Sequence, residues 1–595
     1  MEAHPVIIHD FARKIRFDPS PTSEKADESM NIQDTMPSAD HTVHTKCLTD
    51  EALTFTAKLR SRQTLMNLFP VTFSIFLVLG GYLPYLDKGE IVFADIQRAL
   101  ILTPLFTSFL WLIFYFFFRD WKQSAILSWF MLVALFTSTY QYKILSDLAI
   151  LDTQEQIWIL LFGLWFGTIG LVYLLRQRLR RLTDIVFKML SYLGIFFLCV
   201  PLFSILIHDI QSRIHHTRFS LAASPQEMAI PLKDMQNAGE TYPHIVYMIL
   251  DGYGRGDVLK EIYGFDNSKF LNTLEKKGFY IAQKSHANYA QTVLSLASSL
   301  NFDYLNEIPH RLGIQSEDKG PVRDLIQHSR AVSILRQHGY KIAAFSSGIS
   351  FTELRDADTF MSHPLTLNEW ESFYLMRTPI PAASKALYNF TLQDAHKARL
   401  FYTFEHLPTV IHYEQPHFVF AHFVAPHPPF VLGKQPATEK NKSFSFRDGS
   451  HYRKYYRATS GEYIASYTKQ LQALNEQIEK TIEKILVHSE RPVVIIIQGD
   501  HGPGAYVDWE DPSKTIFKER LSILNAFFIP NGDKIGLYAG MTPVNSFRIL
   551  FNHYFHSNIP LLEDRSFFST MKRPYDFIPI TDMNKNFHLL RQFSK

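Results

Sequence analysis

Cysteine and net charge are both scarce in this chain. Its 595 residues include 2 cysteines, Cys47 and Cys199, and the formal net charge is +3 at pH 7. All residues after Cys199 therefore lack a thiol for a disulfide, a zinc site or nucleophilic catalysis. Because the net charge is small and no dense Lys/Arg block occurs outside short clusters beside the apolar runs, the sequence gives no indication of nucleic-acid binding.

Long apolar runs are confined to the N-terminal third. The mean hydropathy of −0.06 averages this apolar part with a polar remainder. Five runs of 19 to 21 residues contain no Asp, Glu, Lys or Arg: residues 66–86, 99–118, 124–142, 156–175 and 189–207. At about 1.5 Å per residue, a helix of this length crosses the roughly 30 Å of a bilayer's hydrocarbon core. We therefore expect five transmembrane helices.

Basic residues in the connections predict the orientation of these helices. They gather before the first run, in the second connection and in the fourth: Lys58, Arg60, Arg62, Arg119, Lys122, Arg176, Arg178, Arg180, Arg181 and Lys188. By the positive-inside rule the N-terminus is cytoplasmic, and the chain after the fifth helix lies in the periplasm or outside the cell. Since the runs contain no charged residue, an anchor is favoured over a transporter.

The chain divides into four predicted segments. Residues 1–62 form a polar tail that we expect to be disordered, and residues 63–207 hold the five helices. Residues 208–240 are a basic and polar connector, for which a plain linker is slightly favoured over a segment lying on the membrane surface. Residues 241–595 form the extracytoplasmic domain.

Short apolar runs alternate with helical patterns in this last segment. The predicted strands cover residues 244–250, 341–345, 417–424, 493–497 and 526–529, and a representative helix covers 462–486. Continuously apolar strands of this kind are typical of a mostly parallel sheet covered by helices on both faces. The predicted fold is thus five transmembrane α-helices followed by a soluble α/β domain.

Two predicted strands end in acidic residues. Asp251 follows the first strand, and Asp500 and His501 follow the late one between glycines. Ligands of open α/β sheets bind beyond the carboxyl ends of strands, and carboxylate with imidazole suits zinc or manganese. Taken singly, each motif is more often a turn or a surface loop. Together they predict one metal-binding crevice.

A candidate nucleophile precedes a helix of small residues. Thr292 stands where the polar loop from His286 enters that helix. A hydroxyl at a helix N-terminus lies beside free N–H groups and the positive end of the helix dipole, which favour a phosphate and a developing alkoxide. The alternative is that Thr292 only caps the helix.

The order of these motifs resembles that of the alkaline phosphatase/sulfatase superfamily. Asp251-Gly is followed by Thr292, by a Pro-His-Pro-Pro segment around His427 and by Gly-Asp500-His501-Gly. Five membrane helices ahead of such a domain look like the membrane-anchored branch, the lipoteichoic acid synthases and the phosphoethanolamine or phosphoglycerol transferases. The resemblance covers roughly residues 66–595.

That resemblance implies roles for the motif residues. Asp251, Thr292, Asp500 and His501 would bind one divalent ion, zinc or manganese, with a second ion left open, and Thr292 would be the nucleophile. His427 would contact the phosphoryl group or protonate the leaving oxygen; the alternative makes it one of 25 ordinary histidines.

The sequence departs from relatives of this kind at two positions. Lipoteichoic acid synthases have Glu where this chain has Asp251, and sulfatases have a C/S-x-P-x-R motif that is absent around Thr292. Sulfatase chemistry is therefore disfavoured. His422, inside a predicted strand, is assigned to the core.

The resemblance predicts a membrane-bound, metal-dependent transferase. It would move a phospholipid-derived phospho head group, through a phospho-threonine, to an envelope glycan or lipid acceptor. Two alternatives stay open: a phosphodiesterase or phosphatase that uses water, and a non-catalytic membrane-anchored binding protein.

Overall fold

The structure is a computed structural model that describes residues 68–148, 153–218, 242–364, 366–412, 414–440, 442–532 and 535–590. The predicted disordered tail, residues 1–62, lies outside the described residues, as does most of the predicted connector, residues 219–240.

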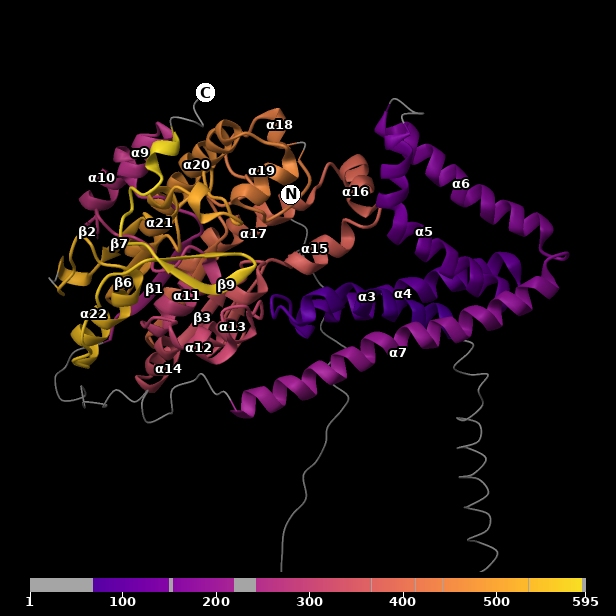
Figure 1. The fold of residues 1–595 in the computed structure, drawn as a ribbon, viewed down its shortest axis with the longest axis horizontal. Coiled ribbons are helices and arrows are strands. Elements are labelled where there is room, and N and C mark those ends of the chain that lie inside the picture. Colours follow the sequence, from indigo (N-terminus) through magenta and orange to yellow (C-terminus); the bar gives the residue numbers. More distant parts are fainter. Residues whose placement is uncertain are drawn as a thin grey trace, which may run out of the picture. The chain divides into compact units, whose positions relative to one another are not determined.

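Five long apolar helices precede the α/β domain (Figure 1). They are α3 (Phe69–Leu86), α4 (Phe93–Phe118), α5 (Trp121–Asp147), α6 (Gln154–Leu175) and α7 (Arg180–Arg218). Each is long and apolar enough to cross a membrane, as the sequence predicted. Several extend beyond the charge-free runs, because charged residues such as Asp95 and Arg98 remain helical at the ends of the spans.

A tight turn joins α4 to α5. Arg119 ends α4 with a left-handed backbone (φ 53°), and Asp120 then begins α5 by accepting hydrogen bonds from the backbone N–H groups of Lys122 and Gln123. These side-chain bonds satisfy amide groups that the first helical turn leaves unpaired. The chain therefore reverses direction within two residues.

The central sheet of the α/β domain has seven strands in the order β2-β7-β6-β1-β5-β3-β4. The strands are β1 (His244–Leu250), β2 (Phe279–Ile281), β3 (Lys341–Phe345), β4 (Thr359–Met361), β5 (His417–Phe423), β6 (Val493–Gln498) and β7 (Asn525–Phe528). β6, β1, β5, β3 and β4 are parallel. β7 pairs antiparallel with β6, and β2 pairs antiparallel with β7, so the edge strand β2 runs in the same direction as the five parallel strands. The mostly parallel sheet is confirmed, and its two three-residue edge strands, β2 and β4, were not predicted.

Helices cover both faces of this sheet. The helices of the domain are α9 (Gly256–Tyr263), α10 (Ser268–Lys276), α11 (Thr292–Asn301), α12 (Glu307–Leu312), α13 (Gly320–Gln327), α14 (Arg330–Gln337), α15 (Glu369–Leu375), α16 (Ile380–Tyr388), α17 (Leu392–His406), α18 (Ala437–Lys440), α19 (Gly449–Tyr456), α20 (Ser460–His488), α21 (Phe517–Leu521) and α22 (Pro543–Phe555). Successive strand residues point to opposite faces, so β1 sends Ile245 and Tyr247 toward α11, α13, α14 and α22, and Val246 and Met248 toward α10, α17 and α20. This two-sided apolar core holds the strand ends in place.

A separate hairpin lies beside the start of α11. It pairs β8 (Phe567–Thr570) with β9 (Arg573–Pro579) in an antiparallel sheet that the sequence did not predict. Tyr289, in the loop before α11, forms a β-bridge with Phe567. The hairpin therefore fixes the loop that leads to Thr292.

Ion pairs connect the α/β domain to the membrane helices. On α4, Arg98 pairs with Glu371 of α15, and Asp95 lies 2.7 Å from the guanidinium of Arg355. In the connection before α4, Glu90 accepts a hydrogen bond of 2.8 Å from Lys319. These contacts define the domain-facing ends of the membrane helices.

Candidate active site

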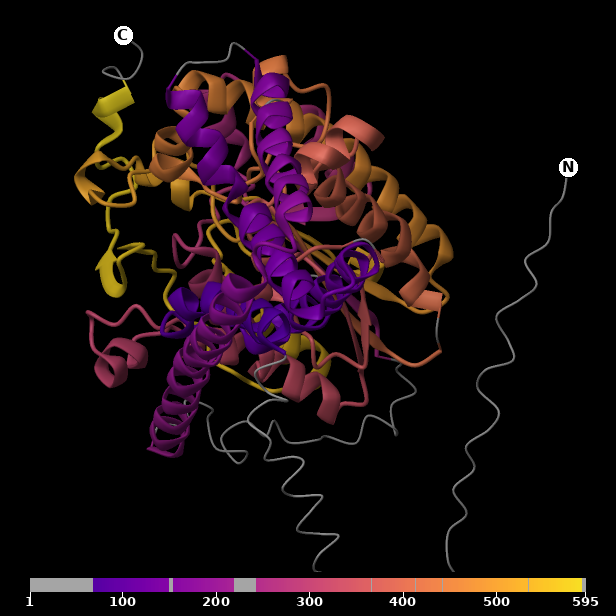
Figure 2. The ribbon, with the colours of Figure 1, turned by 90° about the vertical axis from the view of Figure 1, so that its right-hand side faces the viewer.

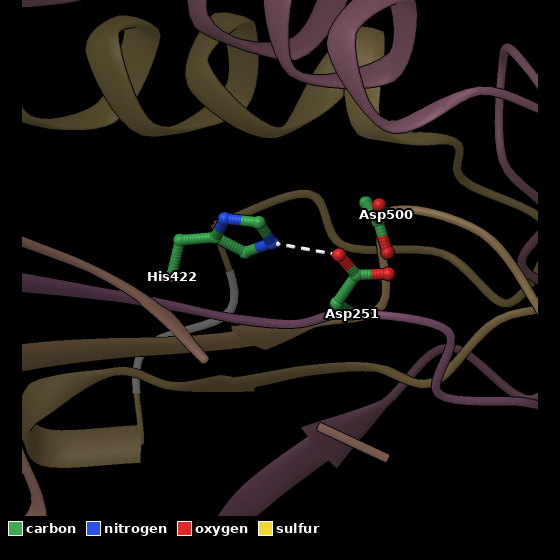
Figure 3. Close-up of side chains that lie close together, drawn as sticks. All are labelled: Asp251, His422 and Asp500. Atoms are coloured by element: carbon green, nitrogen blue, oxygen red, sulfur yellow. Dashed lines mark hydrogen bonds and ion pairs between the residues drawn. The ribbon is translucent and has the colours of Figure 1, made fainter. Parts of the chain in front are cut away.

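The strand ends that carry the predicted ligands lie at one edge of the sheet. β5, β1 and β6 are adjacent and parallel, so their carboxyl ends point the same way. Asp251 follows β1 directly, Asp500 follows β6 after one residue, and His422 belongs to the end of β5. Figure 3 shows these three side chains converging, and one ligand atom of each lies within 4.8 Å of the others.

Asp251 lies between two imidazole rings. It is 1% exposed, with His422 Nε2 at 3.2 Å from its Oδ2 and His501 Nε2 at 3.4 Å from its Oδ1. Burial alone would raise the pKa of Asp251, but the charge of His427 and the hydrogen bond from His422 lower the pKa well below its usual range. Asp251 is therefore a carboxylate at neutral pH.

Asp500 and His501 form the other side of the site, and neither is exposed. His501 Nε2 lies 3.1 Å from Asp500 Oδ2, while the Gly252 N–H donates to Asp500 Oδ1 at 3.0 Å. The Ser295 hydroxyl of α11 donates to the Asp500 carbonyl at 2.6 Å. The loops after β1 and β6 and the start of α11 are thus joined directly to one another.

The glycines around Asp500 and His501 are required by close packing. A Cβ on Gly499 would lie 2.6 Å from the carbonyl oxygen of Tyr253, and a Cβ on Gly502 would lie 2.0 Å from that of Glu519. Neither glycine has a left-handed backbone. These two glycines are therefore required by contact with neighbouring backbone, and not by a bend that needs a positive φ.

Thr292 is the first residue of α11, as the sequence predicted. Its Oγ1 lies 2.9 Å from His501 Nε2. Thr292 is half-buried, whereas the residues that follow it in α11 are buried. The side-chain amide of Gln291, the residue before it, donates to the carbonyl and to the hydroxyl of Ser569 on β8. The N–H groups of the first turn lack helical acceptors, so the hydroxyl stands in a place suited to an anion.

Three side-chain atoms between Asp251, Asp500 and His501 are suited to bind a divalent cation. His501 Nδ1 lies 2.9 Å from the Gly502 carbonyl, which only accepts, so in the neutral ring Nδ1 carries the proton and Nε2 presents a lone pair. Asp251 Oδ1 and Asp500 Oδ2 are buried without a hydrogen-bond partner among the described residues. Three lone pairs that face one another are stabilised by a cation, and this donor set suits zinc or manganese.

The structure brings together Asp251, Thr292, Asp500 and His501, the four residues predicted to bind the ion. Their ligation of an ion stays a prediction.

His422 is closer to the site than the sequence suggested. It is buried, in keeping with its assignment to the core, but its Nε2 faces Asp251 and its Nδ1 lies 2.9 Å from the hydroxyl of Thr352. The core assignment was therefore incomplete. His422 stands two residues before the end of its predicted strand, but only the pairing of that strand with β1 shows that the ring lies beside Asp251.

His427 lies on the loop after β5, near the same carboxylates. Its backbone N–H donates to the Asp251 carbonyl at 3.0 Å, and its Nδ1 donates to the Pro428 carbonyl at 2.6 Å. Burial lowers the pKa of His427, but the negative charges of Asp251 and Asp448 outweigh it and raise the pKa above its ordinary value. These two carboxylates therefore favour the protonated form of the His427 imidazole.

Two residues that the sequence analysis missed support this arrangement. Asp448 Oδ2 lies 4.0 Å from His427 Nε2 and accepts a hydrogen bond of 2.7 Å from Arg520, which is 2% exposed. Arg520 also donates to the carbonyl of Ala290, two residues before Thr292, and to the carbonyl of Gly502. Neither residue belongs to a short motif, so sequence spacing could not reveal them.

Comparison with protein families now identifies the domain. The family model described as Sulfatase matches residues 243–549, just over half of the chain. The chain belongs to this family. With its five candidate membrane helices, it is a membrane enzyme of the sulfatase superfamily.

Several solved structures are similar to the chain. The integral membrane lipooligosaccharide phosphoethanolamine transferase A from Neisseria meningitidis has a TM-score of 0.35 at 12% identity, covering 79% of this chain and 89% of its own. The zinc complex of the periplasmic domain of EcEptC from Escherichia coli has a TM-score of 0.36 at 10% identity, covering 59% and 96%.

A 2-O GAG sulfatase has a TM-score of 0.35 at 14% identity, covering 54% of this chain and 72% of its own. Because the TM-scores are below 0.5, these similarities assign no reaction to the chain. No curated protein sequence matches it.

Proposed function

We propose that this protein transfers a phosphorylated head group from a membrane phospholipid to a glycan or lipid acceptor of the cell envelope. The observation that carries the proposal is the contact of 2.9 Å between Thr292 Oγ1 and His501 Nε2, beside the buried carboxylates of Asp251 and Asp500. A hydroxyl at a helix N-terminus and next to a cation site is suited to attack phosphorus.

Four residues would hold the ion in this proposal: Asp251, Thr292, Asp500 and His501. A bound divalent ion would lower the pKa of the Thr292 hydroxyl and neutralise charge on the phosphoryl oxygens. The Thr292 hydroxyl would release its proton to water, and Oγ1 would form a bond to phosphorus while the bond from phosphorus to the diacylglycerol oxygen breaks. The product is a phospho-threonine that carries the head group.

His427 supplies the proton for the leaving oxygen in this scheme. The negative charges of Asp251 and Asp448 raise its pKa and so favour the protonated ring, and its backbone N–H donates to the Asp251 carbonyl at the edge of the site. The same ring, once neutral, accepts the proton of the acceptor hydroxyl that displaces the head group from Thr292. One histidine thus acts as acid in the first step and as base in the second.

In this proposal the five membrane helices hold the domain beside the leaflet that contains the donor lipid. We propose that the N-terminus is cytoplasmic and that the catalytic domain lies on the outer side of the cytoplasmic membrane, in keeping with the basic residues of the connections. An enzyme held against the leaflet of its lipid substrate meets that substrate at a high local concentration.

Mass spectrometry of the full chain tests the proposal. The protein, reconstituted with zinc or manganese and mixed phospholipids, is expected to carry a head-group adduct on Thr292. The Thr292→Ala variant should carry none. Thr468→Ala, which removes a hydroxyl bonded only within α20, is the matched control and should behave like the native chain.

The outcomes separate the alternatives. Head-group release to water without transfer to an added sugar or lipid acceptor indicates a phosphodiesterase. Absence of both adduct and turnover in the native chain contradicts an enzymatic role and favours a binding protein.

A further inference from the structure

The segment of α15 and α16 is the part of the catalytic domain that reaches farthest along the membrane helices. On α3, the Gly81 carbonyl lies 3.4 Å from Trp370 Nε1. On α4, the Thr103 hydroxyl lies 3.3 Å from that of Tyr374. Trp370 and Tyr374 are buried in an apolar cluster with residues of both membrane helices. The segment is therefore packed against the membrane helices themselves.

The depth of these contacts follows from the helix register. Thr103 lies five residues beyond Arg98, the last charged residue at the domain-facing end of α4, which is about 7.5 Å farther along the axis. On α5, Thr139 lies four residues before Lys143, and its hydroxyl donates to the Met376 carbonyl at 2.9 Å. Tyr374 and Met376 are thus level with charge-free parts of the spans.

The helix that follows, α16, leaves an apolar face uncovered. None of its residues is buried, and Ile380, Leu387 and Tyr388 are 51%, 74% and 79% exposed. At 3.6 residues per turn Ile380 and Leu387 share one face, Tyr388 flanks it, and Lys385 points to the opposite side.

This exposed apolar surface is concentrated in one short segment. Of the ten large apolar side chains exposed in the described residues after 241, four lie between residues 380 and 390: Ile380, Leu387, Tyr388 and Phe390. A cluster of this kind on an otherwise well-packed domain marks an interaction surface.

We propose that α16 lies in the lipid interface, on the leaflet that faces the catalytic domain. Its apolar face would enter the boundary between head groups and acyl chains, and Lys385 would point to the head groups and water. A helix of nine residues is about 13.5 Å long, too short to span, so it lies in the membrane plane. The continuity of the chain supports lipid as the occupant, since α16 begins three residues after Arg377, whose carbonyl accepts a bond from Ser138 of α5.

Through α16 the domain would contact the bilayer in addition to the five membrane helices. The proposal does not depend on the reaction, because it is based only on the packing of α15 and on the exposed face of α16. Tyrosine and lysine near an apolar face are also the residue types found at membrane interfaces.

Fluorescence quenching in lipid nanodiscs tests the proposal on the full chain. In a cysteine-free parent (Cys47→Ser, Cys199→Ala), Leu387→Cys is labelled with an environment-sensitive fluorophore, and lipids with a spin label high on the acyl chain are included. Val487→Cys is the matched control, because Val487 is also 74% exposed but precedes the start of β6, at the opposite end of the sheet from the site.

We expect at least threefold stronger lipid quenching at residue 387 than at residue 487, with emission shifted to the blue. Tyr388→Cys is a second position that should give the same result if Leu387→Cys alters the helix. Equal, weak quenching at the three positions overturns the proposal. Quenching by a spin label on a second copy of the chain, without quenching by lipid, also overturns it, since the face would then be a protein interface.

Discussion

The buried pair of Arg520 and Asp448 allows a quantitative test of the site's construction. We consider Arg520→Met, which keeps much of the side-chain volume but removes the charge. Three acceptors would lose their donor: Asp448 Oδ2 and the carbonyls of Ala290 and Gly502. The Asp448 carboxylate would stay buried with the Tyr463 hydroxyl as its remaining hydrogen-bond donor among the described residues.

Two quantities indicate the size of the effect. Burial raises the pKa of Asp448, but Arg520 and His427 lower it to about 2 from 3.8, and this shift corresponds to about 2.5 kcal/mol. Since the folded-state pKa is depressed, this stabilisation is present above pH 4 and is lost only as the pH falls toward 2. Breaking one partner of a buried pair typically costs about 3–5 kcal/mol.

Thermal unfolding in nanodiscs, followed by tryptophan fluorescence, measures the loss. For a domain of about 350 residues the unfolding entropy is about 0.7 kcal/mol per kelvin, so 3–5 kcal/mol lowers Tm by about 4–7 °C. Trp509, whose ring lies 4.7 Å from the Arg520 guanidinium, is a local reporter. Arg565→Met, which removes a surface partner of Glu563, is the control and should shift Tm by less than about 1 °C.

A double variant decides whether the two charges act as a pair. Arg520→Met with Asp448→Asn removes both charges, so it should destabilise less than the sum of the single variants by about 1–3 kcal/mol. If the effects add, or if Arg520→Met is as mild as Arg565→Met, the ion pair does not hold the site together as described.

Three further predictions concern the site and its surroundings. Thr292→Ala should abolish turnover while Tm stays within about 1 °C, since the hydroxyl's recorded contact is with His501; a comparable fall in Tm would instead indicate a structural role. Asp251→Asn should reduce bound zinc or manganese measured by elemental analysis, whereas the exposed Asp266→Asn should leave it unchanged; equal metal content in the two would exclude Asp251 as a ligand. Burial raises the pKa of Glu519 to about 8, so between pH 4.5 and 8 the folded state holds a proton that the unfolded state releases. The free energy of unfolding should therefore fall by up to about 3 kcal/mol as the pH rises from 6 to 8, which lowers Tm by about 4 °C. Glu519→Gln should flatten this pH dependence of Tm, and an unchanged slope would assign it to other groups.

The helices and the central strands could be predicted from the sequence because burial leaves a direct pattern there. The apolar runs at 244–250 and 341–345 coincide with β1 and β3, and the helix predicted at 462–486 lies within α20. The ends of the membrane helices were harder to predict, since hydropathy detects the apolar part of a helix and not its polar ends. The helix α7, for example, continues to Arg218, well past residue 207.

The candidate site was predictable where its residues stand at strand ends or a helix start. Asp251, Thr292, Asp500 and His501 all have such positions. Asp448 and Arg520 act through contacts between distant segments, 72 residues apart in the chain, and no local pattern marks them. His422 was assigned to the core because an apolar strand hides the ring that faces Asp251.

The hydrogen bond from the His427 amide to the Asp251 carbonyl joins the loops after β5 and β1 through a single peptide group. A change that moves the proline-flanked loop would therefore also move the backbone of Asp251. Under the proposed function, variants of the proton donor and of the ion site would have to be designed together, with both loops varied in the same library.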